Sequence, residues 1–259
     1  GVQTCALPIF APMFGAWILS FFPWQMIFAA LAIIGVICWF CVHFFFKESL
    51  PVERRLKLSA YQVTTLYAAI LKDESFRVPM LAGCLTGAAL FCYISSASAV
   101  FMGQYLLSQQ HFSYAFALNA AGIMLMSSLN KHLNTRMEIF PRLRLGGAIQ
   151  CFGALVVVSA GLMHDAPLWF LMSGLFLVVS GIGLTGPNAM ALAMSKQGAR
   201  AGTASAIMGS MQFACGLLGG VILNLLIWKA SLNMGIMMLL FTSAGLFAIF
   251  KVGKQQNSI

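Results

Sequence analysis

The chain has 259 residues, of which 60% are hydrophobic and 8% are charged, with a net charge of +9 and a mean hydropathy of +0.89. A soluble domain carries about a quarter charged residues, so this composition excludes a water-covered globular surface and predicts a protein whose solvent is lipid. The net positive charge does not indicate nucleic-acid binding, because the basic residues lie in loops without a basic aromatic face.

About 20 apolar residues cross the hydrocarbon core of a bilayer. On this measure the chain contains one partial span, residues 10–22, and seven full spans. The full spans are predicted at residues 24–46, 79–107, 112–129, 145–163, 167–194, 202–228 and 230–250. Between the first two of these, residues 59–71 have apolar residues at helical spacing and predict a short interfacial helix. Residues 251–259 are polar, and we expect them to form a disordered tail.

The 15 Lys and Arg residues lie only in the gaps between these apolar runs, and mostly in every second gap. Six lie from Lys47 to Arg77, four from Lys131 to Arg144, two at Lys196 and Arg200, one at Lys229, and two at Lys251 and Lys254. Loops that stay in the cytoplasm are rich in Lys and Arg. The pattern therefore predicts that the rich gaps and the C-terminus are cytoplasmic.

Residues 1–9, GVQTCALPI, resemble the translation of a sequencing adapter, although an ordinary apolar helix start could have the same sequence. The chain also does not begin with Met. We therefore expect residues 1–9 to be an artefact and the chain to be the C-terminal part of a longer protein. The remaining predicted units are a pair of helices at residues 10–46, a cytoplasmic loop at 47–78, a six-helix unit at 79–250 and a tail at 251–259.

Three groups of local sequences resemble known transporters. The first, APMFGA from Ala11 with FPWQMIF from Phe22, resembles the fifth-to-sixth helix junction of major facilitator drug/proton antiporters, with Ala11, Ala16 and Gln25 as departures. The second, YISSAS from Tyr93 with FALNA from Phe116, resembles helices seven and eight of the Bcr/CflA (bicyclomycin/chloramphenicol) resistance exporters. The third, GPNA from Gly186 with AGTASA from Ala201, resembles helices ten and eleven of that group. Ala99 stands where the pattern has Pro.

This resemblance implies an all-α integral membrane protein with a partial major facilitator fold, from the end of helix five through helix twelve of twelve. It implies a monomer in the bacterial inner membrane that exports small amphipathic drugs in exchange for protons. Titratable groups inside a membrane carry such protons, and no Asp, Glu, Lys or Arg lies in the middle of a predicted span. We therefore expect the proton carrier in missing upstream helices, and no transport by this chain alone.

Two other functions stay open, namely a metabolite or sugar exporter with the same fold, and a non-transporting membrane scaffold. No set of His, Asp, Glu or Cys residues is assembled in or near the spans. We therefore expect no enzyme activity, no metal site and no cofactor.

Tyr93, Ser96, Val100 and Gln104 fall in one stripe at 100° per residue. A polar stripe on an apolar helix must face protein or water, because lipid cannot satisfy it. Two interpretations remain, a substrate-binding cavity wall and hydrogen bonds between helices. The candidate substrate-binding residues are Tyr93, Ser96, Gln104, Asn119, Asn188 and Gln212, with contact between helices the alternative for each.

Gly181, Gly183, Gly186 and Pro187 interrupt one span, since proline removes a backbone donor and kinks a helix. This interruption predicts a hinge, with a static kink as the alternative. Small residues also predict close helix packing at Gly209 and Gly216, and the partial span contains two further hinge or packing candidates, Pro12 and Gly15.

Overall fold

The computed structural model describes residues 14–15, 17–46 and 59–256, and this part of the chain is helical without strands. Seven of its helices are long and apolar enough to cross a membrane, as predicted. They are α2 (Gln25–Phe45), α4 (Glu74–Ser98, continued by the π-helix η2, Ala99–Gln104), α5 (Gln109–Leu133), α6 (Ile139–Leu162), α7 (Leu168–Met194), α8 (Ala201–Leu225) and α9 (Ala230–Gln256). Residues 1–9 and Pro12 lie outside the described residues, as does the start of the partial span.

The helices extend beyond the apolar runs because their polar ends are capped. Asp73 caps α4 by accepting a hydrogen bond from the Ser75 amide at 2.9 Å, so this helix begins at Glu74, five residues before the predicted span. Ser59 caps the predicted short helix, α3 (Ala60–Lys72), through a reciprocal pair of bonds with Gln62. Such caps satisfy backbone donors that have no partner inside the helix.

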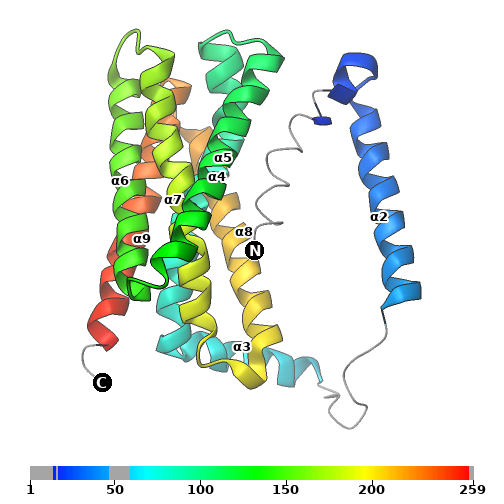
Figure 1. Ribbon diagram of the computed structural model, residues 1–259, viewed down its shortest axis with the longest axis vertical. Helices are drawn as coiled ribbons and strands as arrows, with labels where there is room; N and C mark the ends of the chain where they lie inside the picture. The colour runs from blue at the N-terminus through cyan, green and yellow to red at the C-terminus, as the bar shows by residue number, and fades with distance from the viewer. Residues whose placement is uncertain (1–13, 16, 47–58, 257–259) are drawn as a thin grey trace.

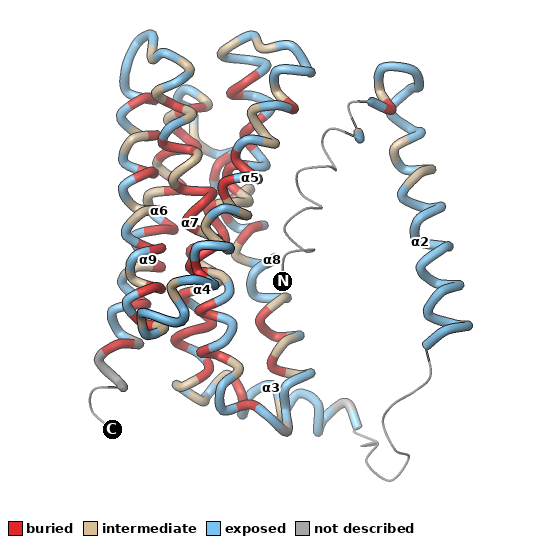
Figure 2. The backbone as a smooth tube through the Cα atoms, in the orientation of Figure 1, coloured by how far each residue is buried: buried red, intermediate tan, exposed pale blue. Residues whose placement is uncertain are grey.

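The helices α4 to α9 pack together, with α4 and α7 the most buried (Figures 1 and 2). The helix α4 contacts α7, α8 and α9, and α7 contacts α5 and α6 as well. Close approach depends on glycine: a Cβ on Gly183 of α7 would lie 2.6 Å from the Ile123 carbonyl oxygen of α5. Small residues at such crossings let two backbones touch.

By contrast, α2 has no buried residue and stands apart from the six-helix unit (Figures 1 and 2). A helix that is apolar and exposed all around its surface needs lipid or another helix as its environment. The division of the chain into residues 10–46 and 79–250 remains a prediction.

The described parts of the basic gaps, apart from that at Lys229, lie at one end of the bundle. In Figure 1 this is the lower end, where α3, the α5–α6 turn, the α7–α8 turn and the end of α9 are found. Among the described basic residues, Lys229 is the exception, since it lies in the α8–α9 turn at the other end. The alternation of charge along the chain therefore corresponds to two ends of one bundle.

The expected disorder after Phe250 is wrong as far as Gln256, because α9 continues to that residue. Its last turns are held by basic side chains over aromatic rings. Arg144 Cζ lies 5.3 Å from the Phe250 ring centroid, and Lys251 Nζ lies 5.1 Å from that of Phe247. Polar composition alone therefore did not predict where this helix ends.

Candidate substrate pocket

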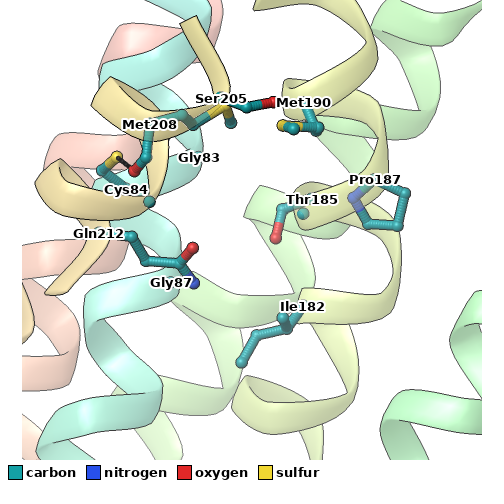
Figure 3. A pocket seen from close by; sticks show the side chains of 12 residues that line it. Gly83, Cys84, Gly87, Ile182, Thr185, Pro187, Met190, Ser205, Met208 and Gln212 are labelled. Atoms are coloured by element: carbon teal, nitrogen blue, oxygen red, sulfur yellow. Dashed lines mark hydrogen bonds between the residues drawn. The ribbon is translucent and has the colours of Figure 1, made fainter. Parts of the chain in front are cut away.

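A pocket of about 570 Å³ lies between α4, α7 and α8. It exists because α7 and α8 both pack on α4 but barely touch each other. Its lining residues are Gly83, Cys84 and Gly87 of α4, Ile182, Thr185, Gly186, Pro187 and Met190 of α7, and Ser205, Met208, Gly209 and Gln212 of α8. Figure 3 shows Gln212 on one side of the space, with Ile182 and Thr185 on the other.

The pocket wall is apolar with a few polar groups. Thr185 Oγ1 donates to the Gly181 carbonyl oxygen at 3.3 Å. Cys84 Sγ lies 3.7 Å from the Met208 carbonyl oxygen. The side chain of Gln212, in contrast, makes no hydrogen bond with any other described residue, so its carboxamide offers a donor and an acceptor to a ligand. No Asp, Glu, Lys, Arg or His lines the pocket. The wall can therefore hold an uncharged apolar surface that carries a hydrogen-bonding group.

Gln212 lies against Gly87, across the boundary between α8 and α4. A Cβ on Gly87 would lie 3.3 Å from Gln212 Nε2. The glycine thus leaves space for the carboxamide, while Met190 and Met208 add flexible side chains that adapt to different shapes.

Of the six candidate substrate-binding residues, Gln212 lines this pocket and the other five do not. Tyr93 and Asn119 are buried and bond to each other, with Asn119 Nδ2 donating to Tyr93 Oη at 3.0 Å. Ser96 is also buried and donates to the Cys92 carbonyl oxygen within its own helix. Tyr93 and Asn119 therefore join α4 to α5 inside the bundle.

Gln104 differs from the rest of the predicted stripe in its exposure. Tyr93, Ser96 and Val100 are buried, whereas Gln104 is exposed at the end of the π-helix η2. Its Oε1 accepts a hydrogen bond from the Ser231 amide of α9 at 3.2 Å. Gln104 thus contacts α9, and its role in substrate binding stays a prediction.

Asn188 belongs to a buried polar network that the sequence did not reveal. Its Nδ2 donates to Asn130 Oδ1 at 3.0 Å, and Arg142 Nη1 donates to the same oxygen at 3.0 Å. Arg142 also donates to Asn134 Oδ1 at 2.7 Å and to the Glu138 carbonyl oxygen at 3.2 Å. The network joins α5, α6 and α7. The predicted spans leave Asn130 and Arg142 between residues 129 and 145, and only the helix packing brings them to Asn188.

The predicted hinge residues take different positions. Gly186, Pro187 and Gly209 line the pocket, whereas a Cβ on Gly181 would overlap Gln150 and one on Gly216 would lie 2.5 Å from Phe91. Next to the kink, Asn188 Nδ2 donates to the Leu184 carbonyl oxygen at 2.7 Å. Gly15 has space around it, with no atom within 4 Å of a Cβ built there.

A pocket between membrane-spanning helices, one of which carries glycine and proline at the pocket wall, is typical of secondary transporters. Residues 2–220 match the family described as the Major Facilitator Superfamily, and the chain belongs to this superfamily. It is therefore a multi-pass membrane protein of a transporter family whose substrates are small molecules, rather than an enzyme.

Its relatives include transporters named for drug resistance. The chain is 28% identical over 213 residues to a bicyclomycin resistance protein homolog of Haemophilus influenzae, covering 82% of this chain and 53% of the relative. It is 31% identical over 265 residues to the MFS-type transporter YdgK of Bacillus subtilis, covering 99% and 65%. It is 25% identical over 236 residues to the multidrug resistance protein MdtL of Vibrio parahaemolyticus, covering 87% and 58%. The chain thus spans less than two thirds of each of these relatives.

Proposed function

We propose that the protein exports small amphipathic drugs across the bacterial inner membrane in exchange for protons, with the α4–α7–α8 pocket as one wall of its substrate site. The names of two relatives, a bicyclomycin resistance protein homolog and a multidrug resistance protein, support this substrate class. The pocket supports it independently, since most binding sites for such molecules are apolar with a few polar groups that orient the ligand.

The observation that carries the proposal is the unpaired carboxamide of Gln212 in an otherwise apolar and uncharged wall. An amphipathic molecule can bury its apolar part against Ile182, Met190 and Met208 and pair one polar group with Gln212. A sugar would need several polar partners and an aromatic surface, and no aromatic residue lines the pocket. The pocket therefore favours the drug exporter over the sugar exporter.

Proton coupling requires a titratable group that the transport cycle exposes to each side in turn. The described acids, Asp73, Glu74, Glu138 and Asp165, lie at helix ends or in turns, away from the pocket lining. We infer that the proton carrier belongs to a part of the transporter outside the described residues. We further infer a monomer with the basic end of the bundle in the cytoplasm, no nucleic-acid partner, and a site that opens by motion about the Pro187 kink.

The test compares bicyclomycin accumulation in drug-sensitive bacteria that express the full-length transporter gene containing this chain, with and without a protonophore. We expect lower drug accumulation that the protonophore abolishes. We also expect Gln212→Ala in the purified chain to weaken bicyclomycin binding roughly fivefold, the value of one hydrogen bond. Gln110→Ala, an exposed glutamine outside the pocket, is the control. Equal effects of the two substitutions on drug binding would contradict the proposal. Drug accumulation that is the same with and without the protonophore would contradict it as well.

A further inference from the structure

The side chain of Arg144 is held in place where the start of α6 packs against the end of α9. Its guanidinium lies over the Phe250 ring, with Cζ 5.3 Å from the centroid. One turn further along α9, Gly253 is buried, and a Cβ there would overlap Arg144 Nη2. Residues three apart share a helix face, so a ring and a glycine together form a seat for the guanidinium. In Figure 1 this is the lower end of the bundle, near the C-terminus.

The hydrogen-bond donors of Arg144 are unused. Its Nε is buried without a hydrogen-bond partner, and the guanidinium forms no salt bridge with any carboxylate in the described part of the chain. Arg142, two residues earlier, differs completely, since each of its three nitrogens donates to an oxygen. Arginine keeps its charge and carries five N–H donors in a rigid fork. A fixed arginine with open donors is therefore prepared to receive oxygens from a molecule outside the chain.

The residues around Arg144 indicate the charge and the location of a molecule that could bind its free donors. Lys251 adds a second cation at this place, with Nζ 5.1 Å from the Phe247 ring centroid. Both rings are exposed, Phe247 by 64% and Phe250 by 49%, on a helix that spans the membrane. Exposed rings beneath cations place the apolar surface against acyl chains and the charges at headgroup level. These features together fit an anion that reaches this edge from the lipid.

We propose that Arg144 and Lys251, seated on Phe250, Gly253 and Phe247, bind the phosphate of an anionic phospholipid at the α6–α9 edge. The planar fork of Arg144 matches two phosphate oxygens in a bidentate pair, and Lys251 adds a point charge. Free phosphate has the same oxygen chemistry, but the exposed rings favour the lipid because only the lipid brings acyl chains to cover them.

The test measures lipid retained by the full chain after purification in detergent with phosphatidylglycerol or phosphatidylcholine, using native mass spectrometry. We expect preferential retention of phosphatidylglycerol, and a loss of about fivefold in Arg144→Gln, the value of one basic residue at a membrane surface. Gly253→Ala changes no charge but displaces the guanidinium, so it should also reduce retention. Arg144→Lys keeps the charge without the fork, and retention should be intermediate.

Arg136→Gln is the matched control, because Arg136 is exposed in the α5–α6 turn, at the same end of the bundle, and lies outside the seat. If Arg136→Gln lowers retention as much as Arg144→Gln does, general surface charge explains the binding and the site is refuted. Unchanged retention in Gly253→Ala, with helicity preserved, refutes it as well. A further experiment adds inorganic phosphate at millimolar concentration to identify the source of the bound phosphate group. Loss of phosphatidylglycerol retention would indicate a site for free phosphate, and unchanged retention would indicate a site for the lipid headgroup.

Discussion

Single side chains determine the chemistry of the pocket. Gln212 supplies a carboxamide with no partner in the described structure, and Gly87 supplies the space in which it lies. An apolar wall contributes affinity but little orientation, whereas a placed donor and acceptor orient a ligand. Under the proposed function, the pair of Gly87 and Gln212 would therefore control which polar group of a substrate is recognised.

We predict that Gly87→Ala weakens drug binding by roughly fivefold, the value of one displaced hydrogen bond, because its Cβ would lie 3.3 Å from Gln212 Nε2 and would tilt the amide. Gly209→Ala is the control, since it lies in the same pocket but a Cβ there meets no atom within 4 Å. Fluorescence titration of the purified chain measures both variants, and equal affinities would contradict this role for Gly87.

A second prediction concerns Leu106, which follows the π-helix with φ at 54°. This left-handed conformation brings the Cβ of an L-residue too close to its own backbone, at a cost of about 1–2 kcal/mol. Glycine has no such cost, so Leu106→Gly should be about 1 kcal/mol more stable than Leu106→Ala. Both variants remove the same exposed side chain, and chemical unfolding in detergent measures the difference between them. A less stable glycine variant would show that the conformation carries no strain.

At the scale of elements, the part of α7 around Pro187 connects the pocket to the basic end of the bundle. Pro187 lines the pocket, and the next residue, Asn188, bonds to Asn130 and through it to Arg142. Arg142 is only 5% exposed and has no carboxylate partner among the described residues. Its charge lies beside the C-terminal end of α5, where the helix dipole is negative. A movement of α7 at Pro187 must therefore move or break this network.

We predict that Asn130→Ala destabilises the bundle by about 2–4 kcal/mol, because it removes the acceptor shared by two buried donor groups, one of them charged. Those groups are Asn188 Nδ2, which keeps its bond to the Leu184 carbonyl oxygen, and Arg142 Nη1. Asn134→Ala, which removes an exposed partner of Arg142, should cost about 1 kcal/mol. Thermal unfolding in detergent measures both, and similar losses would show that the shared Asn130 oxygen is not the centre of the network.

At the scale of the whole molecule, Asp73 joins the segment before the six-helix unit to the α7–α8 turn. Its Oδ1 accepts from the Ser75 hydroxyl at 2.7 Å, and its Oδ2 accepts from Gln197 Nε2 at 2.9 Å. These bonds, first that from Ser75 and also that from Gln197, lower the pKa of Asp73 below its usual value. Gln197 is buried in the α7–α8 turn, so the entry of α4 and the end of α7 are tied together.

We predict that the hydrogen bonds between Asp73 and its partners Ser75 and Gln197 weaken only in acid. Because the pKa of Asp73 is lowered by folding, its contribution is present at neutral pH and is lost as pH falls through the pKa of the folded state. Thermal unfolding followed from neutral pH to about pH 3 should show this loss. Asp73→Asn keeps an acceptor that cannot titrate, so it should remove that part of the pH dependence. An unchanged pH profile in Asp73→Asn would assign the dependence to other carboxylates.

The sequence by itself determined the spans and their alternating ends. The length of an apolar run and the placement of Lys and Arg are local properties, and lipid selects helices for any such run. For this reason the seven long helices and the basic end of the bundle followed from composition and spacing. The polar ends were less predictable, since the start of α4 and the end of α9 depend on a cap at Asp73 and on the seat of Arg144.

Only the tertiary structure decided what each polar residue contacts. The fold placed Gln104 in contact with the start of α9, and the packing of α5, α6 and α7 brought Asn188 to Asn130 and Arg142. Gln212 faced the pocket because α7 and α8 separate on either side of α4. The direction in which a side chain points depends on helix phase and on neighbours far away in the chain. Neither is contained in the local pattern of apolar and polar residues.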